Sequence, residues 1–350
     1  MADELIVIDG SQGLGGGQIL RTCLGLAAAT GRAFRITNIR AGRPRPGLAP
    51  QHLAAVRAAA AICGAEVSGD RIGSAELTFR PARVRPGQYA FDIGTAGSTV
   101  LLLQAIIPAL LVASGDSQVS ATGGTHNPMA PCFEYLRDVF GLLASAAGLQ
   151  AYFELKRPGF YPAGGGKVLM QVQGLASPDQ LEAVRLTSRG ELKRIEGISA
   201  AGGGLPNHIA HRQCAQVLAR LGAAGHRATV EQVHWDSDSP GTVVFLRAVF
   251  ARTVAGFFSL GQRGKPAERV ADEAADQLLA FLASSGVVDA HAADQLITIL
   301  ALCPRESRLV TERITDHLLT NAQVVRQLLG RNVSVEGAVG QPGMVSVQGR

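Results

Sequence analysis

The chain has 350 residues, more than one typical domain, and 47% of them are apolar while only 5% are aromatic. The net charge of +5 excludes a histone-like excess of basic residues but fits an anionic substrate such as a nucleotide or an RNA end. Five scattered cysteines argue against a disulfide framework or a thiolate zinc site, and they favour a cytoplasmic protein. The longest apolar stretch, Val100–Ala113, is too short to span a bilayer, so we expect no membrane segment.

The first distinctive segment is a glycine-rich loop at residues 10–17, between a short apolar run, Leu5–Ile8, and an expected helix, Gln18–Ala29. Such a loop presents backbone N–H donors at the positive end of the helix dipole, which favours a phosphate. Arg21 follows one turn later. Because the loop lacks the Gly-Lys-Ser/Thr of a P-loop and the acidic partner of a dinucleotide fingerprint, a tight structural turn remains an alternative.

A pattern of strand, helix, strand and helix then recurs along the chain. After its first helix, the first unit is expected to contain a strand and a helix at Phe34–Ile39 and Pro50–Cys63. The second unit opens at Asp92, and its elements are expected at Thr99–Ala113, Gln118–Ala121 and from about Pro131. The third is expected to contain Asp294–Cys303, Arg308–Arg313 and Asn321–Leu329, then strands around Val333 and Val345. Three copies predict an α/β (α+β) fold of small sheets with helices packed inside.

The third unit is late in the sequence. We expect the strand at Lys167–Val172 to lead into its first helix, which begins only near Asp294. The stretch between them has its own expected strands and amphipathic helices, at Glu191–Ala200, Asn207–Leu221, Thr242–Phe250 and Ala267–Ala283. We therefore predict an inserted α/β domain at residues 185–285, with residues 1–184 and 286–350 forming the main domain.

A few polar residues stand out as candidates for chemistry. Arg40, Arg43 and Arg45 lie on a proline-stiffened loop, which favours anion binding over a merely solvated loop. Gln104 interrupts an apolar helix, so it faces either a hydrogen-bonded core or a site. His317 is expected between a strand and a helix, although a lone histidine is more often structural than catalytic.

Asp294 is expected to open the matching helix of the third unit, together with Gln295. A carboxylate at that position is a good N-terminal charge, so helix capping alone would explain it.

Seven motifs, in this order, make the chain resemble the RNA 3′-terminal phosphate cyclases. They are Asp9–Arg21, Ile39-Arg-Ala-Gly-Arg, Pro50-Gln-His-Leu, Gly123-Gly-Thr, Gly159-Phe-Tyr-Pro-Ala-Gly-Gly-Gly, Ala293-Asp-Gln-Leu and His317-Leu-Leu-Thr-Asn. The resemblance implies a main domain of three repeated units, like those of enolpyruvyl transferases, with a smaller insert. It also implies ATP-dependent conversion of an RNA 3′-phosphate into a 2′,3′-cyclic phosphate.

The resemblance further implies a role for particular residues. His317 matches the nucleophile that carries AMP as a phosphoramidate. The ATP-binding positions match Gln104, His291, Ala292, Ala293, Asp294 and Gln295. Those that line the phosphate-binding or RNA-binding surface match Arg21, Arg40, Arg43 and Gln51. A divalent metal, Mg²⁺, is implied with ATP, but its ligands are unknown.

The chain departs from the family at three positions. Leu14 replaces a glutamate associated with metal and nucleotide contact, which leaves metal positioning open. His291 replaces a tyrosine beside the adenine site, and His126 replaces an aspartate near the site.

Two other functions are alternatives: a catalytically impaired, cyclase-like RNA-binding protein of ribosome assembly, and an enolpyruvyl transferase. The presence of His317 weighs against the first, and His317-Leu-Leu-Thr-Asn with the insert weighs against the second. The sequence leaves open the RNA substrates, the role of the insert and whether the chain forms a homodimer.

Overall fold

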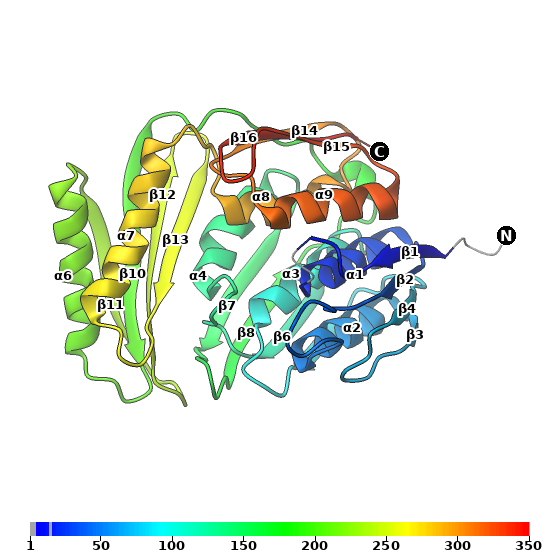
Figure 1. Cartoon of the computed structure of the whole chain (residues 1–350), viewed down its shortest axis with the longest axis horizontal. Coiled ribbons are helices and arrows are strands. Elements are labelled where there is room, and N and C mark those ends of the chain that lie inside the picture. The colour runs from blue at the N-terminus through cyan, green and yellow to red at the C-terminus, as the bar shows by residue number, and fades with distance from the viewer. Residues whose placement is uncertain (1–4, 14–15, 350) are drawn as a thin grey trace.

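Three of the four sheets in this protein are built to one plan (Figure 1). The structure is a computed structural model that describes residues 5–13 and 16–349. In each of the three, the chain runs strand, helix, strand, helix, strand, strand, and the four strands lie in the spatial order first, second, fourth, third. The first two strands pair in parallel and the other neighbours are antiparallel. The predicted α/β fold of repeated units is confirmed.

The elements of the three units follow in chain order. The first unit contains β1 (Ile6–Asp9), α1 (Gln18–Thr30), β2 (Phe34–Thr37), α2 (Pro50–Cys63), β3 (Glu66–Ser68) and β4 (Leu77–Arg80). The second contains β5 (Gln88–Asp92), α3 (Thr99–Leu111), β6 (Ser117–Gly123), α4 (Phe133–Tyr135), the π-helical η1 (Leu136–Phe140), α5 (Gly141–Ser145), β7 (Ala151–Arg157) and β8 (Gly166–Val172). The third contains β9 (Arg185–Leu186), α8 (Ala290–Leu300), β14 (Ser307–Thr311), α9 (Asp316–Leu329), β15 (Val333–Glu336) and β16 (Gly343–Val347). A short 3-10 turn, η2 (Pro178–Gln180), connects the second unit to the third.

The expected start of the third unit was wrong. The strand near Lys167 is β8, the last strand of the second unit, which pairs with β6 and β7. The first strand of the third unit is the two-residue β9, whose residues pair in parallel with Arg308 and Leu309 of β14. A strand of two residues carries too little periodicity to be seen in a sequence.

Between β9 and α8 the chain forms the fourth sheet, in the order β11-β10-β12-β13, which stands to one side of the three units (Figure 1). Its elements are β10 (Leu192–Gly202), α6 (His208–Ala223), β11 (Ala228–Trp235), β12 (Gly241–Phe250), β13 (Val254–Leu260) and α7 (Ala267–Ala283). Helices α6 and α7 pack on each other and on this sheet. The insert boundaries at 185 and 285 remain a prediction, with Arg185 and Leu186 paired to the third unit.

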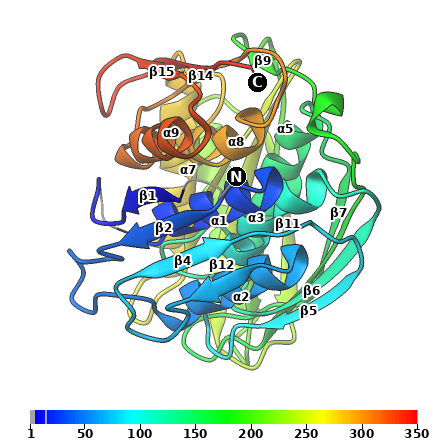
Figure 2. The same cartoon turned by 90° about the vertical axis from the view of Figure 1, so that its right-hand side faces the viewer.

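The three repeated sheets surround helices that form the core of the main domain (Figure 2). Helix α1 packs on α3 and α9, and α8 packs on α9. Helix α3 is buried along almost its whole length, and α1 is buried from Ile19 to Ala28 except at Arg21. Gly25 brings α1 close to α3, because a Cβ there would lie only 2.7 Å from the carbonyl oxygen of Ala105. All five cysteines are buried and unpaired, and none of the described helices is long and apolar enough to cross a membrane.

Two helices begin earlier than predicted. Helix α8 starts at Ala290, with the Asp289 side chain accepting a hydrogen bond from the backbone N–H of Ala292. Asp294 therefore lies inside the helix and does not cap it. Helix α9 starts at Asp316, so His317 lies in its first turn and not in a loop before Asn321.

Candidate functional site

A cavity of about 690 Å³ lies where the first turns of α1, α2 and α9 meet α3 and α8. The insert contributes Phe258 of β13 and Gln277 of α7. Most of the residues singled out from the sequence line this cavity, namely Arg21, Arg40, Arg43, Gln51, Gln104, His291, Asp294, Gln295 and His317. Segments almost 300 residues apart in the chain thus share one site.

Three guanidinium groups give the cavity a positive wall. Burial lowers the pKa of Arg21 to about 10, so this side chain remains charged at neutral pH. Arg40 donates from Nη1 to the carbonyl oxygen of Gly47, 2.8 Å away, which fixes its direction. Among the described residues, Arg21 and Arg43 have no side-chain hydrogen bond or ion pair. Unpaired cations in a cavity favour an anionic ligand.

The glycine-rich loop enters the same wall through Gly16 and Gly17. A Cβ on Gly17 would overlap the His52 ring, and one on Gly16 would lie 3.4 Å from the Arg43 guanidinium. Glycine is therefore favoured at position 17, where the fixed His52 ring leaves no room for a side chain, whereas Gly16 has ordinary contact distances around it. Leu14 and Gly15 of this loop, and with them the expectation about metal contact at position 14, lie outside the described residues.

His52 is a lining residue that the sequence reasoning missed, although it lies within the Pro50-Gln-His-Leu motif. Its Nδ1 accepts a hydrogen bond from the backbone N–H of Ala49 at 3.2 Å, which fixes the ring at the start of α2. Burial, with help from the charges of Arg21 and Arg40, lowers the pKa of His52 to about 3. The ring is therefore neutral, with its Nε2 on the side of Gly17.

His317 enters the cavity from the first turn of α9 and is half-buried. Burial lowers its pKa, and the charge of Arg21 lowers it further. An imidazole with a lowered pKa is neutral at pH 7, and a neutral imidazole can act as a nucleophile.

Hydrogen bonds between α8 and α9 fix the turn that carries His317. Thr315 caps α9 by accepting from the N–H of Leu318 at 2.9 Å, and it donates to Asp294 Oδ1 at 2.6 Å. Asn321 donates to the carbonyl oxygen of Asp294 at 2.7 Å, while its Oδ1 accepts from Thr22 of α1 at 2.7 Å. Three helices are thereby connected beneath the cavity. Burial raises the pKa of Asp294 to about 7.

The part of the lining that α3, α8 and the insert contribute is less charged. Gln104 donates to Gln295 Oε1 at 2.6 Å, so the polar residue inside α3 has a partner and also faces the cavity. The His291 ring lies 6.0 Å from the Phe258 ring and 5.8 Å from Tyr135, with an edge-on contact to Tyr135. Two adjacent rings at the mouth of a cavity suit a flat heteroaromatic group.

Some predicted residues lie elsewhere. Ala292 and Ala293 are fully buried in the first turn of α8 and do not line the cavity. His126 is buried outside it, between Phe160 and Trp235, with its Nε2 2.9 Å from Glu134. His126 thus has a buried carboxylate as its partner, away from the cavity. Phe258 and Gln277 come from the insert, and no motif marks them.

The described residues contain no group of three or more His, Cys, Asp or Glu side chains that could hold a metal ion. Asp294 contributes a carboxylate to the cavity, but its Oδ1 already accepts a hydrogen bond from the Thr315 hydroxyl. The lining residues that the structure describes therefore do not form a protein cage for a metal.

The comparisons agree with the resemblance seen in the sequence. A model of the family described as "RTC: RNA 3′-terminal phosphate cyclase" matches residues 12–335. Three proteins named RNA 3′-terminal phosphate cyclase are similar over nearly the whole chain. The one from Methylococcus capsulatus is 45% identical over 99% of this chain and 97% of its own length. Those from Hyperthermus butylicus and Ectopseudomonas mendocina are 44% and 43% identical, covering 93% and 94% of this chain and 92% and 94% of their own lengths.

A solved EPSP synthase from Acinetobacter baumannii aligns at 12% identity over 99% of this chain and 65% of its own, but its TM-score of 0.35 carries no argument. The family match and the three relatives are sufficient by themselves: the chain belongs to the RNA 3′-terminal phosphate cyclase family.

Proposed function

We propose that this protein uses ATP to convert an RNA 3′-terminal phosphate into a 2′,3′-cyclic phosphate, with AMP carried covalently on His317. The observation that carries the proposal is the position of this neutral, half-buried imidazole in one cavity with three guanidinium groups. An RNA-binding scaffold that has lost catalysis would have no need of this arrangement, so we do not favour that alternative.

Two groups of lining residues support ATP binding, one for the adenine and one for the phosphates. Phe258 and His291 offer ring faces for the adenine, and Gln104 with Gln295 offers amide groups beside it. Arg21 and Arg43, with the backbone of Gly16 and Gly17, supply positive charge and N–H donors for the phosphates.

In the first step, a neutral ring nitrogen of His317 attacks the α-phosphorus of ATP. The bond from this phosphorus to the β-phosphate oxygen breaks, and pyrophosphate leaves as a phosphoramidate forms. Arg21 and Arg43 stabilise the negative charge that collects on the leaving pyrophosphate.

In the second step, an oxygen of the RNA 3′-phosphate attacks the same phosphorus, and the P–N bond to His317 breaks. The RNA end now carries AMP through a diphosphate linkage. In the third step, the neighbouring ribose 2′-oxygen loses its proton and attacks the 3′-phosphorus, and AMP leaves. The closure is intramolecular, and AMP is a better leaving group than a phosphate oxygen.

A divalent metal that accompanies ATP would be held chiefly by the phosphates, because magnesium commonly binds through substrate phosphates and few protein ligands. The described lining residues offer no cage for it. The five unpaired, buried cysteines support the further proposal of a cytoplasmic location.

The test is incubation with ATP labelled at the α-phosphate in the presence of Mg²⁺. We expect label on the denatured wild-type protein that survives alkali and is lost in acid, as a phosphoramidate is. His317→Ala should carry none, although its circular dichroism spectrum should match the wild type. His226→Ala, on the insert and outside the cavity lining, is the matched control and should label normally.

Conversion of a 3′-phosphate oligoribonucleotide to its cyclic form completes the test. Label that persists in His317→Ala, or label that wild type never acquires, would reject the covalent mechanism.

A further inference from the structure

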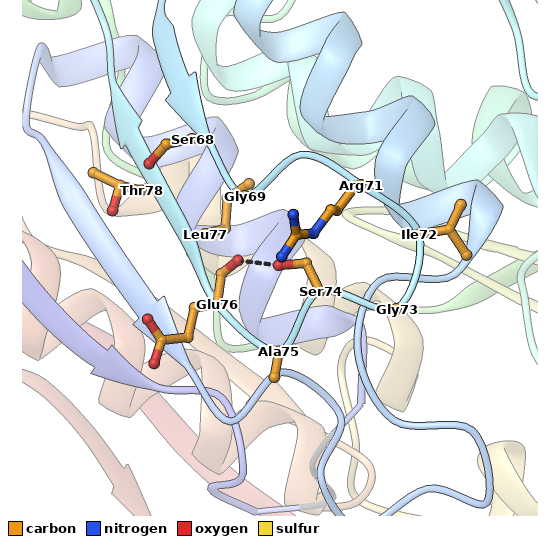
Figure 3. A pocket seen from close by; sticks show the side chains of 10 residues that line it. All are labelled: Ser68, Gly69, Arg71, Ile72, Gly73, Ser74, Ala75, Glu76, Leu77 and Thr78. Carbon is orange, nitrogen blue, oxygen red and sulfur yellow. Dashed lines mark hydrogen bonds between the residues drawn. The ribbon is translucent and has the colours of Figure 1, made fainter.

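Two more cavities lie near the site, one between the first and second units and one on the first unit. The second, of about 610 Å³, lies between α2 and the end of β5 and is lined by Pro50, Leu53, Ala54, Arg57, Ile72, Ala90, Phe91, Asp92, Ile93, Gly94 and Thr95. The third, of about 530 Å³, is formed by residues 68–78, the hairpin between β3 and β4 (Figure 3). Neither has a part in the reaction steps described above.

The three cavities adjoin one another. Gln51 lines the first, and a Cβ on Gly97 would lie 2.8 Å from its Cβ, so the 94–97 loop touches the rim of the site. Gly94 and Thr95 of that loop line the second cavity. Ile72 lines both the second and the third. A ligand that leaves the site past Gln51 therefore meets the second cavity and then the third.

Arginines also lie along this path from Gln51 through the second cavity to the third. Arg57 lines the second cavity and Arg71 the third, and both are exposed. Within the described part of the chain, neither side chain has a hydrogen bond or ion pair. Their charges continue the positive wall that Arg21, Arg40 and Arg43 form inside the site.

The carboxylates along the route are few and largely engaged. Asp92 Oδ1 accepts from the N–H of Gly94 at 2.8 Å. Glu76 forms an ion pair with Arg35 at 2.6 Å, and its carboxylate points away from Arg71 in Figure 3. Asp70, next to Arg71, is exposed. With Asp294 of the first cavity, the route has four carboxylates against six arginines, Arg35 included, so positive charge prevails.

The loop with Arg40 and Arg43 is fixed to the hairpin that carries Arg71. The N–H of Leu48 donates to the carbonyl oxygen of Ser74 at 3.0 Å, and the N–H of Gly73 donates to that of Leu48 at 2.8 Å. A Cβ on Gly47 would overlap the Gly73 carbonyl. The two basic segments thus form one connected surface, which lowers the entropy lost when they bind an extended ligand.

We propose that this route, from Gln51 through Arg57 to Arg71, binds the single-stranded RNA nucleotides that precede the 3′-phosphate. The inference rests on the proposed function, because it takes the RNA end to lie in the first cavity. Arg57 and Arg71 contact backbone phosphates, and the apolar lining of Leu53, Ile72 and Phe91 accepts bases. The recognition depends on charge and shape, so it does not require a particular sequence.

The experiment measures binding of fluorescent oligoribonucleotides with a 3′-phosphate, two and twelve nucleotides long, to the ATP-free protein at several salt concentrations. For Arg57→Gln/Arg71→Gln we expect about tenfold weaker binding of the dodecamer, with little change for the dinucleotide. Two lost phosphate contacts should reduce the slope of log K against log salt by about 1.4.

The matched control is Arg227→Gln/Arg252→Gln. It removes the same charge from two exposed arginines of the insert that line none of the three cavities. It should leave both the affinity and the salt slope at wild-type values.

Labelling by ATP alone separates this inference from the proposed function, and both double variants should label like wild type. A dodecamer that binds the Arg57/Arg71 variant as tightly as wild type, or a dinucleotide that binds wild type as tightly as the dodecamer, would overturn the RNA route. Absence of labelling in wild type would instead count against the covalent mechanism.

Discussion

His52 and His317 face the same cavity from two different helices, and both rings titrate below the ordinary range of histidine. For each, burial is the main cause, and the charge of Arg21 lowers the pKa further. The cations that attract a polyphosphate therefore also keep the proposed nucleophile free of a proton. The same cations thus attract phosphate and, before ATP binds, help to keep the His317 ring neutral.

The lowered pKa of His52 has a consequence for stability. Between about pH 6.5 and pH 3 the unfolded chain protonates this ring while the folded protein does not. The unfolded state then binds more protons, so the free energy of unfolding falls as the pH falls. His52→Asn keeps an acceptor for the Ala49 N–H but removes the titration, and its stability should fall less steeply in acid.

Urea denaturation at pH 6.5, 5.5 and 4.5 checks this. The stability of wild type relative to His52→Asn should fall by about 1 kcal/mol from pH 6.5 to 5.5 and by about 1.3 kcal/mol from pH 5.5 to 4.5. A constant difference across the three pH values would show that the ring is protonated in the folded state as readily as in the unfolded one.

The sequence identified Arg21, Arg40, Arg43 and His317 because they lie in motifs that occur in the same order in the family it resembles. The sequence did not predict that Phe258 and Gln277 line the cavity, because no motif distinguishes these two side chains from other surface residues of the insert. Nor did it show that Ala292 and Ala293 face the core. In a short apolar turn both sides carry apolar residues, so the sequence does not indicate which side is buried.

At the scale of elements, the starts of α8 and α9 were the least accurate part of the prediction. Both helices were expected to begin four or five residues too late, at Asp294 and Asn321. The true starts are marked by Asp289 and Thr315, whose side chains accept the hydrogen bonds of N-terminal caps. Asp and Thr are common capping residues, but most of them in a sequence cap no helix. Only the conformation of the surrounding backbone determines which of them is a cap.

Thr315 joins this cap to the site. Thr315→Val keeps the shape of the side chain but loses both the bond from Leu318 N–H and the bond to Asp294. Loss of a cap costs about 1 kcal/mol, and the freed first turn no longer fixes His317. We expect a lower melting temperature and a slower rate of labelling by ATP, measured in a single turnover.

Thr315→Ser retains the hydroxyl and should restore both the melting temperature and the labelling rate nearly to wild-type values. If Thr315→Val loses stability but labels at the wild-type rate, the cap supports the helix without positioning the imidazole.

At the scale of the whole molecule, the recurrence of strand and helix was enough to predict three repeated units. It was not enough to find their full topology. Strands β3, β5 and β9 are short edge strands with little burial, so they leave almost no signal, and the β8 strand was assigned to the wrong unit as a result. The site depends on this topology, because each unit contributes helices to one shared core.

The tight contact between α1 of the first unit and α3 of the second tests whether the units behave as one rigid body. Gly25 of α1 faces α3, where an added Cβ would lie 2.7 Å from the Ala105 carbonyl oxygen and 3.2 Å from the Pro108 ring. Backbone cannot yield as a flexible side chain does, so Gly25→Ala must push α1 and α3 apart. We expect a loss of about 1–3 kcal/mol in unfolding free energy. Because Arg21 and Gln104 lie on these two helices, binding of ATP should weaken as well.

Gly222→Ala is the matched control. Gly222 lies inside α6, and an added Cβ there would have no atom within 4 Å. In this helix the replacement should raise stability by about 0.5–1 kcal/mol, because alanine loses less backbone entropy than glycine on folding. The two variants make the same chemical change in opposite surroundings, so thermal unfolding of both isolates the helix contact. Equal stability of the two would mean that α1 and α3 can separate without cost, and the three units would then not need to move together around the site.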